Sequence, residues 1–421
     1  MRHQKVMMWV SVSGTAISIF LVMVMFMVNG LKTVEIAPET DRTRIYEGEG
    51  LHIRSLENPD RYSSSSYSYR AAYRLYNNLE GVELVSYYKP GVQNNIMVKG
   101  KIPVKVRPKI VDGNYWKMYD FNFLAGAPFT EGQCFDATKR IVLSRSVAQD
   151  IFSDIDVVGR ELNMDGFNYV VSGVVEDINP ILYNTRSDVW IPLDEEHRNS
   201  FSGQQGQTVM GSVIVLLKFK DNVDPKSIKE QVKARYKAYN SELAKENWEI
   251  LYHGAPYSIE EVECLIDFTE PDVKTPKRRR YMLYLVLILL PAINLSSMVR
   301  GRLQRRVSEI GVRRAYGATR KGILLQLLSE NFIVTLLGGL IGLILTCLFM
   351  LFISSEFFID VPDSSSLASG MLKPVFTMLF TWQQFIFVLG ICFILNLLTA
   401  TIPAWKAASV EPAVAISKLK S

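Results

Sequence analysis

The sequence predicts an α-helical membrane protein with four transmembrane helices and a large α+β extracytoplasmic domain between the first and second spans. Two observations support this fold class. Long runs without a charged residue lie near both ends of the chain, and a stretch of mixed helix and strand signals, 30–276, separates the first run from the others. The hydrophobic share of 48% and the mean hydropathy of +0.10 are high for a soluble protein, and the excess is confined to those runs.

The first span is expected within residues 1–29. The segment Val6–Val28 contains no charged residue and, at about 1.5 Å per residue, is long enough to cross a hydrocarbon core of about 30 Å. A cleaved signal peptide has a shorter apolar core and a cleavage site of small residues, which 28–31 does not provide. We therefore expect an uncleaved anchor after a short cytoplasmic N-terminus.

Residues 30–276 are expected to form the α+β extracytoplasmic domain. Apolar and aromatic residues recur at helical spacing in Tyr67–Leu79. Asp224 is expected to cap a second helix, with Pro225 in its first turn and its end near Trp248. Short apolar runs typical of strands are Ile141–Leu143, Tyr169–Val175 and Val213–Phe219.

Three further spans are expected at 277–299, 323–354 and 382–405, with an extracytoplasmic loop at 355–381 and a tail at 406–421. The connecting loop 300–322 carries eight basic residues against a single acid, Glu309. Because loops rich in Lys and Arg stay in the cytoplasm, this loop, the tail and both termini are placed there. The basic run Lys277–Arg280 falls on the outer side, but long translocated domains are largely insensitive to this bias.

Charge and cysteine content exclude some functional classes. The net charge of +5 is modest, and the basic residues cluster beside the apolar runs, which favours membrane topology over nucleic-acid binding. The sequence contains no C-x-x-C pair for a redox or zinc motif. Cys134 and Cys264 lie in the extracytoplasmic stretch, where they could pair or remain as two free thiols.

The cytoplasmic loop is predicted to contain a short amphipathic helix followed by a tight turn. Leu303, Val307 and Ile310 recur at i, i+4 and i+7 and form one apolar stripe, with arginines on the other faces. Gly317 is placed where a helix ends in a left-handed residue, and Thr319 can cap the next helix. Such a helix could transmit force from a soluble partner, or it could lie on anionic lipid headgroups.

The segment 305–320 also resembles the signature of MacB/FtsX-type ABC permeases, R-x-x-E-I-G-x-R-R-A-x-G-A. The family pattern continues with residues that stand here at the matching places: Ile323, Gln326, Glu330, Gly338, Gly339 and Gly342. The closing motif around 403–412 and the outer segments from Phe121 to Asp177 are similar to the permease domain and to the periplasmic core domain of that family.

This resemblance implies that residues 300–322 form a coupling helix that docks on a cytoplasmic ABC ATPase. The docking residues that it implies are Arg305, Arg306, Glu309, Ile310, Arg313, Arg314, Gly317, Ala318 and Thr319. It also implies a two-fold dimer of permeases in the bacterial inner membrane, with a periplasmic adaptor or an outer-membrane protein as a possible further partner. The spacing Gly338-x-x-x-Gly342 permits close helix approach, either between subunits or within one subunit.

Catalytic motifs are absent from the sequence. There is no G-x-x-x-x-G-K-[ST], no H-E-x-x-H and no G-x-S-x-G, so no catalytic residue, metal ligand or cofactor is assigned to this chain. ATP and Mg²⁺ are expected on the ATPase, which is expected to be a separate polypeptide. The function expected is that of an ABC permease in efflux or lipoprotein release. The alternatives are a regulatory permease that activates a cell-wall hydrolase and a membrane-anchored sensor without an ATPase.

Overall fold

The computed structural model describes residues 2–30, 35–179, 182–200, 208–265, 270–287, 289, 310, 312, 313, 316–352 and 382–408. The chain forms two compact units. One is built from Lys32–Pro276, and the other contains Met1–Leu31 and the described helices after Lys277.

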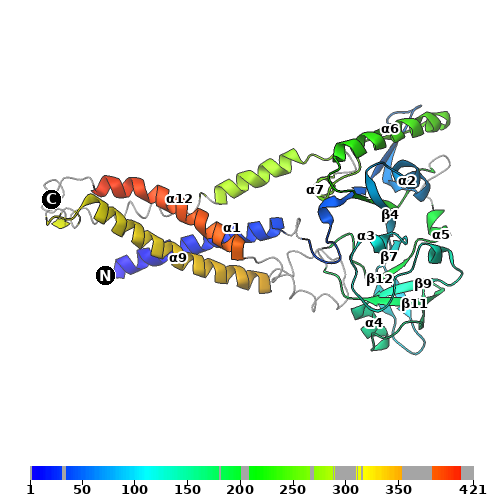
Figure 1. The fold of residues 1–421 in the computed structure, drawn as a ribbon, viewed down its shortest axis with the longest axis horizontal. Helices are drawn as coiled ribbons and strands as arrows, with labels where there is room; N and C mark the ends of the chain where they lie inside the picture. Colours follow the sequence, from blue (N-terminus) through cyan, green and yellow to red (C-terminus); the bar gives the residue numbers. More distant parts are fainter. Residues whose placement is uncertain are drawn as a thin grey trace. The chain divides into compact units, whose positions relative to one another are not determined.

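The helical unit contains three long helices, which pack against one another (Figure 1). They are α1 (Arg2–Gly30), α9 (Arg320–Phe352) and α12 (Trp382–Ala408). The α9 helix contacts both of the others, and α1 also contacts α12. Residues 274–287 are helical as well, so this helix begins before the span expected at 277–299.

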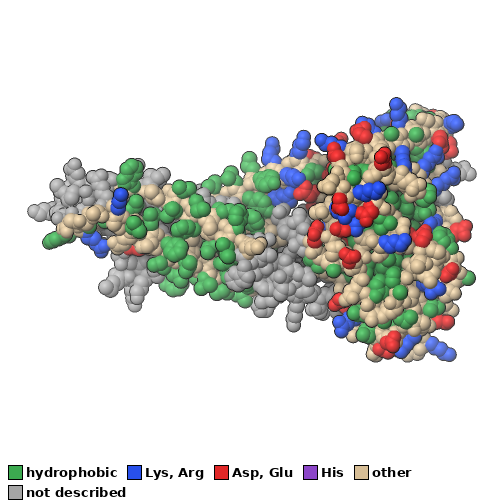
Figure 2. Space-filling model, viewed as in Figure 1, with side chains coloured by type: hydrophobic (Ala, Val, Ile, Leu, Met, Phe, Trp, Pro, Cys, Tyr) green, Lys and Arg blue, Asp and Glu red, His purple; other side chains and the backbone are tan. Residues whose placement is uncertain are grey.

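Within the described residues, one helix is long and apolar enough by itself to cross a membrane, Lys321–Phe349, with a mean hydropathy of 2.6. A shorter apolar helical stretch, Val12–Met27, lies in α1. Figure 2 shows hydrophobic side chains gathered over the helical unit and charged side chains over the α+β unit. The four predicted spans remain a prediction. The large α+β domain is confirmed by the strands and helices of the second unit.

The α+β unit is built on an eleven-stranded sheet with the order β1-β14-β4-β7-β12-β9-β11-β10-β5-β6, and β8 also pairs with β11. The strands are β1 (Ile45–Gly48), β4 (Val82–Pro90), β5 (Asn94–Met97), β6 (Val104–Val106), β7 (Pro108–Val111), β8 (Phe123–Gly126), β9 (Arg140–Ser144), β10 (Glu161–Met164), β11 (Phe167–Val175), β12 (Val189–Pro192) and β14 (Ile214–Phe219). The pairs β9–β11 and β7–β12 are parallel, and the other pairs are antiparallel.

Both faces of this sheet are buried. In β14, Val215 and Leu217 belong to one hydrophobic core, and Ile214 and Leu216 belong to a second core on the opposite face. Successive side chains of a strand point to opposite faces, so a strand between two cores must be apolar at every position. This explains the apolar run Ile214–Leu217 in β14, after which Lys218 pairs with Asp41.

A second sheet has the order β13-β3-β2-β15. Its strands are β2 (Leu51–Ser55), β3 (Tyr62–Tyr67), β13 (Met210–Gly211) and β15 (Trp248–Leu251). The helices and 3-10 turns of the unit are η1 (Arg42–Arg44), α2 (Tyr69–Tyr76), α3 (Tyr115–Met118), η2 (Gly132–Phe135), α4 (Arg145–Phe152), α5 (Glu195–Arg198), α6 (Pro225–Leu243), η3 (Ala244–Glu246) and α7 (Ile259–Val262). The α2 and α6 helices contact each other.

The predicted helix after Asp224 is confirmed at its start and wrong at its end. The side chain of Asp224 accepts a hydrogen bond from the N–H of Lys226, and Pro225 is the first helical residue. The α6 helix ends at Leu243, before Trp248. Asn247 takes a left-handed conformation with φ of 62°, which stops the helical path and lets Trp248 begin β15.

Candidate functional site at the α9 corner

The structure describes five of the nine predicted docking residues. Ile310, Arg313, Gly317, Ala318 and Thr319 lie where a helical segment meets the start of α9. We call residues 310–323 the α9 corner; its positions 311, 314 and 315 are not described. The other predicted docking residues, Arg305, Arg306, Glu309 and Arg314, lie outside the described residues.

The first helix of the α9 corner ends in the way that the glycine predicts. Gly317 has a φ of 95°, a left-handed conformation that glycine adopts without steric cost. The N–H of Ala318 donates to the carbonyl oxygen of Arg313 at 3.1 Å, and that of Tyr316 donates to Val312 at 3.1 Å. This bonding, together with the left-handed glycine, is a Schellman helix end, which closes the free carbonyls of the last turn.

The next helix begins two residues later. The Oγ1 atom of Thr319 accepts a hydrogen bond from the N–H of Gly322 at 3.2 Å, and its carbonyl oxygen accepts one from Ile323 at 3.2 Å. Thr319 is therefore the N-cap of α9, as predicted. The described turn before Thr319 consists of Tyr316, Gly317 and Ala318, so the connection to α9 is short.

One side of the α9 corner is buried and the other is exposed. Ile310 and Ile323 are 7% and 6% exposed, whereas Tyr316 is 89% exposed. Val312 and Arg313 are also exposed, and Nη1 of Arg313 donates to Oε1 of Gln326 in α9 at 3.1 Å. Ile310, predicted as a docking contact, is thus covered within the chain. Tyr316 was not predicted, although an aromatic residue in a turn between two helices is a signal that could have identified it.

The predicted packing glycines bring α9 close to its neighbours. A Cβ atom added at Gly338 would lie 2.8 Å from Cβ of Thr15, and one at Gly342 would lie 2.8 Å from the carbonyl oxygen of Ala16, both in α1. At Gly339 it would lie 2.3 Å from Cδ1 of Leu389 in α12. The surface of α9 that carries Gly338 and Gly342 is therefore covered by α1 of the same chain, which favours close approach within one subunit.

In the α+β unit, the segments that follow α1 and precede the helix at 274–287 are bonded to each other. The N–H of Glu47 in β1 donates to the carbonyl oxygen of Tyr257 at 2.8 Å, and the N–H of Tyr257 donates back at 2.7 Å. Two backbone hydrogen bonds thus join β1 to the segment just before α7.

Buried polar groups hold this entry segment. Thr185 donates to Oε1 of Glu39 through its N–H at 3.1 Å and through Oγ1 at 2.8 Å, and Arg42 lies 3.0 Å from Oε2 of Glu39. Nδ2 of Asn184 donates to Oε1 of Glu47 at 2.6 Å. Burial raises the pKa of Glu47 to about 7, because the charged carboxylate loses its water.

A buried lysine completes this group. Nζ of Lys109 in β7 donates to the carbonyl oxygens of Tyr183 and Asn184 at 3.0 and 2.7 Å and lies 5.0 Å from the ring centre of Tyr88. Burial lowers the pKa of Lys109 to about 7, opposed by the carboxylates of Glu39 and Glu47. The residues 182–186 are thus anchored to β1 and β7 by side chains.

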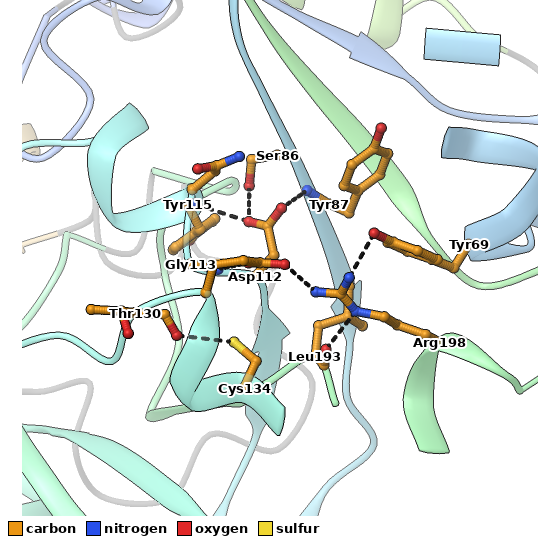
Figure 3. A network of polar contacts seen from close by, with 12 residues as sticks. Tyr69, Ser86, Tyr87, Asp112, Gly113, Tyr115, Thr130, Cys134, Leu193 and Arg198 are labelled. Carbon is orange, nitrogen blue, oxygen red and sulfur yellow. Dashed lines mark hydrogen bonds and ion pairs between the residues drawn. The ribbon is translucent and has the colours of Figure 1, made fainter. Parts of the chain in front are cut away.

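A second buried network centres on Asp112 (Figure 3). Its carboxylate accepts hydrogen bonds from Oγ of Ser86 at 2.7 Å and from the N–H groups of Tyr87 and Tyr115 at 3.0 Å each. Burial raises the pKa of Asp112 to about 7 despite these bonds. The contacts of this carboxylate link β4, β7 and α3, so its role here is structural.

Next to it, Arg198 joins three elements (Figure 3). Nε donates to the carbonyl oxygen of Leu193 at 2.9 Å, Nη1 to the hydroxyl of Tyr69 at 2.7 Å, and Nη2 to Oε1 of Glu131 at 2.6 Å. The guanidinium also lies between the rings of Tyr69 and Phe135, at 4.5 and 4.6 Å from their centres. It therefore ties α5 to α2 and to η2.

The described residues contain no group of three or more His, Cys, Asp or Glu side chains that could hold a metal ion. Cys134 is a buried free thiol, so the structure contains no disulfide between Cys134 and Cys264. The structural features that could transmit a movement are the α9 corner, the glycine contacts of α9 and the hydrogen bonds between Glu47 and Tyr257.

Two family models match the chain. The model described as MacB-like periplasmic core domain matches residues 8–235, more than half of the chain, and the model described as FtsX-like permease C-terminal matches residues 281–412. Both are permease domains.

The chain also resembles curated proteins, at 22–25% sequence identity. The chain is 25% identical over 312 residues to the macrolide export ATP-binding/permease protein MacB of Salmonella paratyphi A, covering 70% of this chain and 43% of that protein. It is 22% identical over 263 residues to MacB of Escherichia coli K12, covering 62% of this chain and 38% of that protein. The chain spans less than half of the length of the curated relatives it matches.

Among solved structures, the periplasmic region of MacB from Actinobacillus actinomycetemcomitans shares 15% identity, with a TM-score of 0.32, and covers 48% of this chain and 88% of that one. The extracellular domain of the ABC-type transporter YknZ from Gram-positive bacteria shares 14% identity, with a TM-score of 0.33, and covers 48% of this chain and all of that one. On the two family matches, the chain belongs to the MacB/FtsX family of ABC transporter permeases, with a MacB-like periplasmic core domain and an FtsX-like permease domain.

Proposed function

We propose that this chain is a permease subunit that couples ATP hydrolysis to movement of its periplasmic domain, and that a cytoplasmic ABC ATPase docks on the α9 corner. In this proposal the ATPase is a separate polypeptide, as the family resemblance implies, and the 421 residues themselves contain no P-loop. ATP and Mg²⁺ are then bound by that partner, and this chain carries no cofactor of its own.

The observation that carries the proposal is the construction of the α9 corner. A Schellman end and an N-cap join the two helices through a short turn, so a displacement of the corner has a short path to the 33-residue α9. The exposed side chains of Val312 and Tyr316 provide apolar and aromatic surface for a partner. Aromatic residues are enriched in protein interfaces.

In this proposal the chain crosses the bacterial inner membrane four times. Helices α1, α9 and α12 contain 29, 33 and 27 residues, so each is longer than the about 30 Å of a hydrocarbon core at about 1.5 Å per residue. The helix that begins at 274 leads into the remaining span. Both termini and the α9 corner are cytoplasmic, and the basic content of the loop 300–322 supports this side.

The substrate is proposed to be handled outside the membrane. Two copies of the chain, each with one ATPase, form the working unit, and the moving part is the periplasmic domain. The pairing of Glu47 with Tyr257 supports this, because the segments that continue from α1 and into the helix at 274–287 would move together. Efflux through a periplasmic adaptor and an outer-membrane partner, or release of a lipoprotein, are the two activities that such a movement serves.

The test is retention of the ATPase. The full chain is purified in detergent with a tagged, co-expressed candidate ATPase of the same organism, and Tyr316→Asp is compared with the wild type. We expect the wild type to retain the ATPase and Tyr316→Asp to release it, because the aspartate places a charge at the most exposed aromatic position of the corner.

The matched control is Tyr62→Asp, which makes the same change at a tyrosine that is 72% exposed in β3. It should retain the ATPase as the wild type does. A folded wild type that retains no ATPase would reject docking altogether. Equal retention by both tyrosine variants would move the docking surface away from Tyr316.

A further inference from the structure

Arg313 and Gln326 stand 13 residues apart in the sequence and meet across the α9 corner. Nη1 of Arg313 donates to Oε1 of Gln326 at 3.1 Å. Arg313 belongs to the last turn of the first helix, and Gln326 belongs to the second turn of α9. This side-chain bond therefore joins the two helices that the corner connects.

The backbone of the corner alone leaves the angle between these helices adjustable. Gly317, at a φ of 95°, can change its dihedral angles with little steric penalty. The carbonyl oxygen of Arg313 accepts the N–H of Ala318, so Arg313 is bonded on both sides of the turn, through its backbone to Ala318 and through its side chain to Gln326. The side-chain bond restrains the freedom that the glycine provides.

The residues that hold the two helices of the corner together are not the residue with the greatest solvent exposure. Ile310 and Ile323, one from each helix, are buried within the chain, and Arg313 points its guanidinium at α9. Tyr316 lies between them in the sequence and is 89% exposed. The corner thus has an internal set of contacts and a separate outward surface.

We propose that Arg313 is a positioning residue that acts through Gln326: their bond fixes the angle between the docking corner and α9, so that a movement imposed by the ATPase reaches α9. This inference rests on the proposed function and gives Arg313 a role other than the docking contact that the motif implies. Arginine suits this role, because its planar guanidinium keeps its charge and offers several N–H donors in a fixed arrangement.

The first arm of the test uses the permease alone. Gln326→Leu removes the acceptor, and the matched variant Gln326→Glu keeps an acceptor of the same shape. Amide hydrogen exchange at Ala318, whose N–H closes the corner on Arg313, should be about fivefold faster in Gln326→Leu than in the wild type. Gln326→Glu should exchange at the wild-type rate or more slowly. Equal exchange rates at Ala318 in both variants would refute the proposal that the Arg313–Gln326 bond restrains the corner.

The second arm uses the complex with the tagged candidate ATPase and measures retention, together with the ATP-dependent change in amide exchange at Glu47 and Tyr257. Gln326→Leu should retain the ATPase within about twofold and lose the ATP-dependent change, and Gln326→Glu should keep both. Release of the ATPase by Gln326→Leu would show that this pair docks the partner, and an unaltered ATP-dependent change would show that it transmits nothing. A wild type that retains no ATPase would reject the proposed function and the positioning role together. The exchange rate at Ala318 would still show whether the Arg313–Gln326 bond restrains the corner.

Discussion

Replacing Gly342 by leucine places a branched side chain where α9 meets the backbone of α1. A Cβ atom at this position would lie 2.8 Å from the carbonyl oxygen of Ala16 and 3.2 Å from Cβ of Ile19. Ordinary contact begins at 3.4 Å, so the first carbon alone requires a local separation of about 0.6 Å, the difference between 3.4 and 2.8 Å. Because the oxygen belongs to the backbone of a helix, it cannot rotate away, and α1 itself must shift.

The cost of that shift follows from what lies along the same contact. Val12 of α1 and Val334 of α9 are buried together, with Ile341 packed against them. A gap of about 0.5–1 Å removes a quarter to a half of the dispersion energy of such contacts, and overpacking costs about 1–3 kcal/mol. Leucine gains back about 0.8 kcal/mol over glycine as a helix former. We expect a net loss of about 1 kcal/mol, or roughly 2–4 °C in the thermal unfolding midpoint.

The assay is thermal unfolding of the full chain in detergent, with Gly390→Leu in α12 as the control. A Cβ atom at Gly390 would meet nothing within 4 Å, so the same substitution should leave the midpoint unchanged or raise it slightly. Gly342→Ala should fall between the wild type and Gly342→Leu. Equal midpoints for the leucine variants at 342 and 390 would refute the close approach of α1 and α9.

Two further predictions concern the periplasmic domain. Because burial raises the pKa of Glu47 to about 7, its folded form binds a proton more tightly than the unfolded form, so its contribution to stability falls as pH rises from about 4.5 to 7. The amide oxygen of Glu47→Gln can still accept from Asn184. Denaturant unfolding at pH 5 and pH 8 should show that the variant reduces the fall in the free energy of unfolding between the two pH values by at most about 3 kcal/mol. The same fall in the variant and the wild type would contradict the burial argument. Arg198→Lys keeps the charge but loses the planar fork, so it should destabilise the domain by about 2 kcal/mol in the same assay, and wild-type stability would show that Arg198 does not tie α5 to α2 and η2.

The parts of the structure that the sequence predicts are those set by local chemistry. Gly317 predicts a helix end and Thr319 predicts a helix start. Both features depend on hydrogen bonds between residues at most five positions apart, so the sequence predicts the corner from local residues alone. The apolar residues of 213–219 predict a strand from their local pattern, and β14 confirms it. The docking role assigned to the loop comes from family resemblance and stays a prediction.

The parts that the sequence does not predict depend on which distant residues the fold brings together. Arg198 meets Tyr69 and Glu131 across 129 and 67 positions, and no periodicity marks that meeting. The spacing of Gly338 and Gly342 indicates a face for close packing but names no partner, and only the arrangement of the helices shows that α1 of the same chain covers it. The bond from Arg313 to Gln326 requires the angle of the corner, which no local pattern specifies.

The two described parts of the proposed pathway are both held by short-range hydrogen bonds. At the α9 corner a turn of Tyr316, Gly317 and Ala318 precedes the N-cap of α9, and in the periplasmic domain two backbone hydrogen bonds tie Glu47 to Tyr257. Asn184 and Thr185 then fasten this entry segment to the strands behind it. A local movement of β1 would have to break several buried hydrogen bonds at about 1–3 kcal/mol each, so we expect β1 to move together with the sheet behind it.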